Sequence, residues 1–286
     1  MAMTYFRNLF FQTDDGITLY VRDYPGPSPD APVVLCLHGL SRNSRDFEDL
    51  APHLQTTHRV LVPDQRGRGR SEHDPVSERY LPQNYVGDML ALLDALAVPR
   101  CAVVGTSMGG LMAMGISALA PGRLSHVVIN DIGPVIGAEG LARIKAVVGS
   151  EMQFASWADA TDYVQTANAA AFPRYTRADW ERFAARACSQ RGDVVMLDYD
   201  PLITAPMKSG GAGTDAGDLW PLFDTLRETP VLLIRGGISD LLDPDCVAEM
   251  RRRHSGLSYL EVPDVGHAPM LDEPGVVDTI LDFLAQ

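Results

Sequence analysis

The sequence contains no apolar run that approaches the roughly 18 to 20 residues needed to span a bilayer. Residues 1–12 also lack the basic stretch and apolar segment that together mark a secretory signal. We therefore expect a complete cytoplasmic protein that does not have a membrane as a partner.

Basic residues are scarce relative to acidic ones. Lysine and arginine total 24 and aspartate and glutamate total 37, which gives a formal net charge of −13. A surface of this sign repels phosphate backbones and anionic lipid heads, so we expect no nucleic-acid partner. A small-molecule substrate is the expected partner, and a homodimer is the one protein assembly that we leave open.

Cysteine is also rare, with four residues and no C-x-x-C pair. Cys36 and Cys101 lie in apolar runs, and no cysteine–histidine cluster has the spacing of zinc ligands. We expect four reduced thiols that behave as small hydrophobic side chains. Nothing in the sequence implies a metal or a cofactor.

What is present is an alternation of strand and helix patterns. Residues 6–12 and 18–23 flank the turn signal Asp14-Asp15-Gly16 and predict a β-hairpin. Residues 33–37 form a short apolar run typical of a strand that is buried on both faces. Further strands are predicted at 59–62, 101–104, 127–130, 231–234 and 258–262, and helices at 47–54, 85–97, 111–120, 244–253 and 275–284. The pattern predicts an α/β fold: a mostly parallel central sheet flanked by helices, with an N-terminal antiparallel hairpin.

This alternation stops at residue 134 and resumes after residue 220. The intervening segment is predicted to be mainly helical, without a strand, and to end in a flexible glycine-rich stretch at 209–217. We therefore predict a core domain made of 1–133 and 221–286, interrupted by a helical insertion at 134–220.

A motif that carries chemistry follows the strand predicted at 101–104. Gly105-Thr106-Ser107-Met108-Gly109 is a G-x-S-x-G sequence between a strand and a helix. A serine on such a sharp turn projects its hydroxyl above the sheet, and the flanking glycines leave room for neighbouring chain. The N-terminus of the following helix favours a developing negative charge beside it. Ser107 is thus the predicted nucleophile.

Candidate partners of Ser107 follow other predicted strands. Val265-Gly266-His267 comes after the last strand and supplies a base, and Asp240 follows the strand at 231–234. We expect Asp240 to orient His267, because nucleophile, acid and base then occur in the order typical of a strand–turn–helix serine. Asp243 and Asp245 lie close to Asp240, and Asp131 ends an earlier strand; each is an alternative acid.

The oxyanion site needs two backbone donors. His38-Gly39-Leu40 follows the third predicted strand, and its turn can aim the Leu40 N–H at the same point as the Met108 N–H. Together, these elements resemble the α/β-hydrolase superfamily along nearly the whole chain. The resemblance implies that the insertion is a cap over the pocket, that His38 buttresses the oxyanion loop, and that the arginine–glycine run at 64–71 is a structural turn.

The resemblance implies a serine hydrolase that cleaves a carboxylic ester or lactone, similar to capped carboxylesterases and to lactone and enol-amide hydrolases. Met108 disfavours a proline iminopeptidase, and a serine at 107 disfavours the dehalogenases and epoxide hydrolases, which use aspartate. Hydrolysis of an enol-amide or of a carbon–carbon bond, and acyl transfer or perhydrolysis by the same serine, remain alternatives. Arg42 and the cap residue Trp157 are candidate substrate contacts, Arg42 because arginine can bind a carboxylate with two hydrogen bonds.

Overall fold

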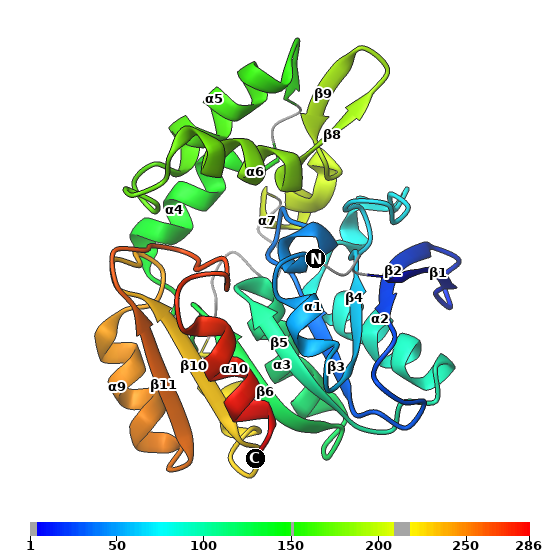
Figure 1. Cartoon of the computed structure of the whole chain (residues 1–286), viewed down its shortest axis with the longest axis vertical. Coiled ribbons are helices and arrows are strands. Elements are labelled where there is room, and N and C mark those ends of the chain that lie inside the picture. The colour runs from blue at the N-terminus through cyan, green and yellow to red at the C-terminus, as the bar shows by residue number, and fades with distance from the viewer. Residues whose placement is uncertain (1–4, 150–151, 209–217) are drawn as a thin grey trace.

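Eight strands form one sheet in the computed structural model, which describes residues 5–149, 152–208 and 218–286. The strand order is β1-β2-β4-β3-β5-β6-β10-β11 (Figure 1). β1 pairs with β2, and β2 with β4, in antiparallel fashion, and the other pairs are parallel. The predicted hairpin and mostly parallel sheet are therefore confirmed. The strands are β1 (Arg7–Gln12), β2 (Thr18–Tyr24), β3 (Val33–Leu37), β4 (Arg59–Pro63), β5 (Cys101–Thr106), β6 (Leu124–Asn130), β10 (Val231–Gly236) and β11 (Leu257–Val262).

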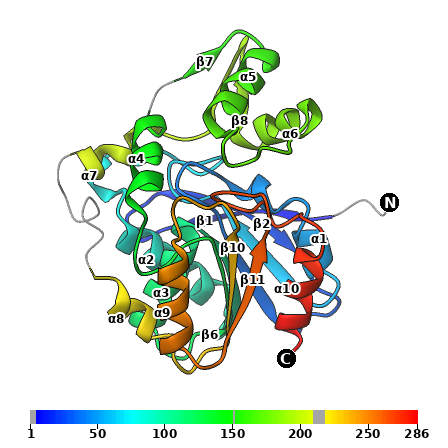
Figure 2. The ribbon, with the colours of Figure 1, turned by 90° about the vertical axis from the view of Figure 1, so that its left-hand side faces the viewer.

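Helices cover both faces of the sheet (Figure 2). On one face lie α1 (Ala51–Leu54) and α10 (Val276–Leu284). On the other lie α2 (Pro82–Ala95), α3 (Met108–Leu119), α8 (Trp220–Asp224) and α9 (Pro244–Arg253). Successive side chains of a strand point to opposite faces, so a strand between two helical layers must be apolar throughout. β3 shows this directly, since Val34 and Cys36 join the core under α1 and Leu35 and Leu37 join the other core.

The helix predicted at 47–54 is wrong in its first half. A 3₁₀ turn at Ser44–Phe47 precedes the short helix α1. The side chain of Asn43 accepts a hydrogen bond from the Arg45 N–H and so begins that turn. Pro52 has no N–H to donate back to residue 48, and this explains why one continuous α-helix does not form.

The insertion lies above the edge of the large sheet at which the parallel strands end (Figures 1 and 2). It contains α4 (Ala138–Val147), α5 (Trp157–Asn168), α6 (Arg177–Ala187) and α7 (Ala205–Lys208). The expectation of no strand in this segment is wrong, because β7 (Gln153–Phe154), β8 (Cys188–Arg191) and β9 (Val194–Leu197) form a small antiparallel sheet. These strands have two to four residues and are too short to display a period in the sequence. The glycine-rich segment at 209–217 lies outside the described residues, and the domain limits at 134 and 220 stay a prediction.

The arginine–glycine run at 64–71 is a turn that connects the core to the insertion. The carboxylate of Asp64 accepts hydrogen bonds from the backbone N–H groups of Ser44 and Arg70, at 2.6 and 2.8 Å. Gly69 adopts a φ of +56° and donates its N–H to the carbonyl of Asp198 in the insertion. The structural role predicted for this run is confirmed.

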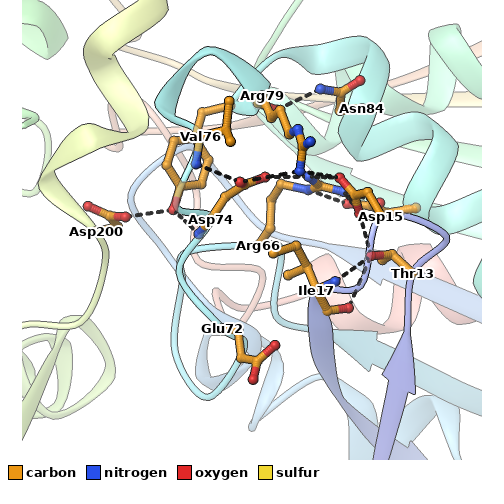
Figure 3. A network of polar contacts seen from close by, with 12 residues as sticks. Thr13, Asp15, Ile17, Arg66, Glu72, Asp74, Val76, Arg79, Asn84 and Asp200 are labelled. Atoms are coloured by element: carbon orange, nitrogen blue, oxygen red, sulfur yellow. Dashed lines mark hydrogen bonds and ion pairs between the residues drawn. The ribbon is translucent and has the colours of Figure 1, made fainter.

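Arg66, in the same run, holds a buried network of carboxylates (Figure 3). Its guanidinium pairs with Asp74 at 2.6 Å, with Asp88 of α2 at 2.6 Å and with Asp15 of the β1–β2 turn at 2.9 Å. The Arg66 side chain is only 2% exposed, and those of Asp74 and Asp88 are 0% and 5% exposed. The hydrogen bonds from Arg66 lower the pKa of Asp15 to about 2. The hairpin, the turn and α2 are thus joined through one cation.

Replacing Arg66 with methionine should destabilise the fold strongly. The substitution leaves Asp74 and Asp88 buried without their cation, and breaking a buried pair in this way costs about 3 to 5 kcal/mol. Denaturant unfolding measures the effect. Arg252→Met is a matched control, because Arg252 pairs with Glu249 on the exposed face of α9 and its loss should change the midpoint little. Equal shifts in the two variants would contradict the role given to Arg66.

Candidate active site

Ser107 occupies a strained turn between β5 and α3. Its φ of +53° and ψ of −114° lie in a region that residues with a side chain rarely adopt. The neighbouring glycines make the turn feasible. A Cβ at Gly105 would lie 2.4 Å from the carbonyl oxygen of Gly109, and one at Gly109 would lie 2.1 Å from that of Leu37. These contacts explain why the sequence needs glycine on both sides of the serine.

His267 joins Ser107 to a carboxylate. Its Nε2 lies 2.9 Å from the Ser107 Oγ, and its Nδ1 lies 2.9 Å from the Oδ2 of Asp131. An ionised carboxylate can only accept hydrogen bonds, so the proton belongs on Nδ1 and Nε2 is left to accept the serine hydroxyl. The predicted meeting of Ser107 and His267, which are 160 positions apart, is therefore present.

The acid that contacts His267 is Asp131, and the prediction of Asp240 for this position is wrong. Asp131 directly follows β6, is fully buried and has a φ of +57°. Its Oδ1 accepts the Gly236 N–H at 2.8 Å, and its Oδ2 accepts the Ser239 hydroxyl at 2.7 Å. Since β6 and β10 are adjacent and parallel, both ends lie near His267, and these donors fix the Asp131 carboxylate toward the imidazole.

Asp240 is held elsewhere by a cation from the insertion. Its two carboxylate oxygens accept hydrogen bonds from Nε and Nη2 of Arg143 in α4, at 2.7 and 2.8 Å. These bonds lower the pKa of Asp240. No sequence pattern indicates this pairing, because Arg143 lies 97 positions before Asp240, on a helix whose docking cannot be inferred from its residues alone. Asp131 was identifiable only as an alternative.

The loop that carries Leu40 is held in place by two buried side chains. His38 accepts the Gln65 N–H on Nε2 at 3.0 Å, so its Nδ1 donates to the Gly39 carbonyl at 2.7 Å. Burial lowers the pKa of His38 to about 4, and this histidine is neutral at pH 7. Arg68 donates from Nε to the Leu40 carbonyl at 2.9 Å. The buttressing position predicted for His38 agrees with these contacts.

Leu40 and Met108 meet the requirements of the predicted donor pair. Met108 is the first residue of α3, and in an α-helix the first N–H groups have no partner within the helix. Over the described part of the chain, neither the Met108 N–H nor the Leu40 N–H donates a hydrogen bond to another protein group. Leu40 also lines the cavity that contains Ser107.

A cavity of about 170 Å³ opens onto Ser107 and His267 between the core and the insertion. Its walls are mostly apolar, and the insertion contributes many of them. These apolar residues include Ile144 and Val147 of α4 and the following Val148, Tyr163 and Val164 of α5, Phe172, Phe183 of α6, and Leu197 and Tyr199.

The two predicted substrate contacts have different outcomes. Arg42 lines the cavity, but it pairs with Asp46 through Nε and Nη2 and its guanidinium stacks 4.3 Å from the centre of the Phe183 ring. Asp46 lines the same cavity, so the pair presents both charges to it. Trp157 does not line the cavity: it is 40% exposed and its indole N–H donates to Gln190 at 3.2 Å. Trp157, predicted as a substrate contact, thus lies outside this cavity, because its position at the start of α5 points it outward.

The described residues form neither a metal site nor a membrane-spanning helix. Within 5–149, 152–208 and 218–286, no group of three or more histidine, cysteine, aspartate or glutamate residues is placed to hold a metal ion. In the same ranges no helix has the length and apolar character required to cross a membrane. The four cysteines are buried free thiols, as predicted.

Known proteins resemble this chain along most of its length. A family model described as "Alpha/beta hydrolase family" matches residues 34–279. The 3-hydroxybutyrate-oligomer hydrolase of Cupriavidus necator is 38% identical over 252 residues, which cover 86% of this chain and 85% of that protein. The 2-(acetamidomethylene)succinate hydrolase of Mesorhizobium japonicum is 29% identical, with 88% and 85% of the two chains covered. A crystal structure of an alpha/beta hydrolase from Novosphingobium aromaticivorans superposes with a TM-score of 0.93 at 37% identity, covering 99% of each chain.

Conservative substitutions can distinguish the roles of Asp131 and Asp240. We expect Asp131→Asn to lower kcat for a 4-nitrophenyl ester by about 10⁴-fold, because an amide no longer selects the needed tautomer of His267. Asp240→Asn should cause a loss that is small by comparison, since Asp240 does not contact the imidazole. Steady-state kinetics of both purified variants test this. A large loss in Asp240→Asn together with a mild one in Asp131→Asn would restore Asp240 as the partner of His267.

Proposed function

The chain belongs to the alpha/beta hydrolase family, and on this basis we propose that it is a serine hydrolase that cleaves a carboxylic ester or lactone of a small molecule through an acyl-enzyme. The observation that carries the proposal is the hydrogen-bond chain from Asp131 through His267 to Ser107. An aspartate, a histidine and a serine joined by hydrogen bonds in this way activate the serine hydroxyl in many unrelated enzymes. The apolar cavity on the Ser107 hydroxyl provides room for an acyl group.

In the first step, the Ser107 Oγ attacks the ester carbonyl carbon while His267 Nε2 takes the hydroxyl proton. The negative charge that develops on the carbonyl oxygen is stabilised by the N–H groups of Leu40 and Met108. One such donor contributes roughly 2.7 to 4 kcal/mol to transition-state stabilisation. The tetrahedral intermediate collapses, the C–O bond to the alcohol breaks, and His267 returns the proton to the departing oxygen.

In the second step, water attacks the acyl-enzyme and His267 again accepts a proton. The acid is released, and the proton returns to the Ser107 Oγ. Asp131 remains a carboxylate throughout: it holds the Nδ1–H tautomer and stabilises the imidazolium that forms in each step. Its hydrogen bonds from Gly236 and Ser239 keep it in place for this task.

The relatives support an ester as the substrate bond. A 3-hydroxybutyrate oligomer is joined by ester bonds, and the hydrolase named for that substrate is 38% identical to this chain over 252 aligned residues. A second candidate is hydrolysis of an enol-amide, which the 29% identical 2-(acetamidomethylene)succinate hydrolase favours. Both bonds contain a carbonyl carbon that the Ser107 hydroxyl can attack, so the same catalytic residues can serve either reaction. Carbon–carbon bond hydrolysis, acyl transfer and perhydrolysis have no comparable support.

Ser107→Ala tests the proposed nucleophile. We expect kcat for short 4-nitrophenyl esters to fall on the order of 10⁶-fold, because no acyl-enzyme can form. The variant should unfold at the same or a higher denaturant concentration. Alanine removes no packing and puts no more strain on the backbone of this turn than serine does. Mass spectrometry should detect an acyl adduct on the wild-type protein alone. Wild-type activity in the variant would refute the proposal.

A panel of substrates distinguishes the candidate bonds. The cavity of about 170 Å³ is smaller than the roughly 300 to 1,000 Å³ of sites for drug-sized ligands, so acetyl and butyryl esters should be preferred to palmitoyl esters. Lactones and an N-acyl enamine complete the panel, each measured against Ser107→Ala. Faster turnover of the enamine than of every ester would favour the second candidate. Added alcohol and peroxide would reveal transfer to another acceptor.

A further inference from the structure

Arg143 presents a positive charge to the cavity, whereas its counter-ion is not part of the cavity wall. Arg143 lines the cavity, and Asp240, to which it is paired, does not. The contrast with Arg42 is informative, because Asp46 lines the cavity together with Arg42 and offsets its charge there. Of the two guanidinium groups in the wall, the one of Arg143 is therefore the better placed to attract an anion.

The pairing geometry leaves one edge of this guanidinium available. Arg143 uses Nε and Nη2 to contact Asp240, and within the described residues Nη1 has no hydrogen-bond partner. Nη1 carries two N–H donors, which suit a carboxylate oxygen. Asp240 thus fixes the side chain without using the donors on its far nitrogen. A guanidinium that is already held in place loses little rotamer entropy when it binds a ligand.

The backbone of α4 is fitted to this arrangement. Gly137 and Gly140 lie against the loop that carries Asp240, and a Cβ there would be 2.4 and 2.8 Å from the Asp240 carbonyl oxygen. The N–H of Gly140 donates to that same carbonyl at 3.2 Å. Arg143 follows Gly140 by three positions and so lies on the same face of the helix. Close docking at the glycines brings the Arg143 side chain to the Asp240 carboxylate.

From these contacts we propose that Arg143 is a specificity-determining residue that binds a free carboxylate of the substrate. This inference rests on the proposed ester hydrolysis and narrows it to small esters that carry an anionic group. The rest of the cavity wall is mainly apolar, so an anion has few other places to be stabilised. The formal net charge of −13 makes a local cation all the more necessary for an anionic substrate. Both a 3-hydroxybutyrate oligomer and a succinate derivative, the substrates for which two relatives are named, contain a carboxylate.

The test uses pairs of substrates that differ in one charge. The linear dimer of 3-hydroxybutyrate and its terminal primary amide share the same scissile ester, and the carboxylate of the dimer lies on the alcohol side. Mono-4-nitrophenyl succinate and its methyl ester place the charge on the acyl side. For each pair, the ratio of kcat/KM for the anionic and neutral members measures the preference. We expect the wild-type protein to prefer the anion in at least one pair.

Arg143→Gln should lower that preference by about 10- to 100-fold, chiefly through a higher KM for the anionic member, because a charge-assisted hydrogen bond is lost. Arg143→Lys should restore part of it, since lysine keeps the charge but not the forked geometry. Asp240→Asn distinguishes anion binding from a merely structural contact between α4 and the core. The asparagine side chain keeps one oxygen that can accept hydrogen bonds from Arg143, but it removes the negative charge. The preference for the anionic substrate should therefore stay at or above the wild-type level.

Two results would overturn the inference. One is a wild-type protein with no preference for the anion in either pair. The other is an Arg143→Gln variant that loses the same factor on anionic and neutral members, as a merely structural contact between α4 and the core would predict. Arg42→Gln is the matched comparison, and we expect it to affect both members alike. If Ser107-dependent cleavage of the neutral esters persists in either case, the proposed hydrolase function stands and only the role of Arg143 fails.

Discussion

The geometry of the site depends on one constraint: adjacent parallel strands end at the same edge of a sheet. β3, β5, β6, β10 and β11 are neighbours in the order of the sheet, although their segments span residues 33–262. The loops after these strands carry the oxyanion segment, the serine, the buried aspartate, the second aspartate and the histidine. No long-range folding device beyond strand pairing is needed to bring these groups together. The apolar character of both faces of the strands keeps this edge rigid.

Two carboxylates lie at the ends of adjacent strands, and their hydrogen-bond donors distinguish them. Asp131 is fully buried and is oriented by a backbone N–H and a serine hydroxyl, and this arrangement directs it to His267. Asp240 is partly exposed and is neutralised by Arg143. A carboxylate already occupied by a guanidinium is a poorer partner for an imidazole. The position of the orienting acid therefore depends on the insertion as well as on the core.

The insertion also decides what kind of molecule can reach Ser107. Residues of the insertion supply much of the apolar wall, and α4 adds one guanidinium whose counter-ion, Asp240, does not line the cavity. The run at 64–71 ties the same insertion to the oxyanion loop: Gly69 bonds to Asp198 and Arg68 bonds to Leu40. The contacts that tie the insertion to the core therefore also hold the loop that carries Leu40. A change in how the insertion docks would affect both.

The sequence by itself determined the alternation of strands and helices, the position of Ser107 and the pairing of Ser107 with His267. These features follow from local patterns, namely apolar runs of strand length, a glycine-bounded turn and a histidine after the last strand. The sequence favoured Asp240 over Asp131 as the partner of His267, and this choice was wrong, because both residues follow adjacent strands and only the direction of each side chain separates them. It also could not exclude Trp157 from the cavity or identify Arg143 within it, since both depend on how the helices of the insertion pack. Tertiary structure decided these points, for the physical reason that hydrogen-bond direction and helix docking arise from contacts between segments far apart in the chain.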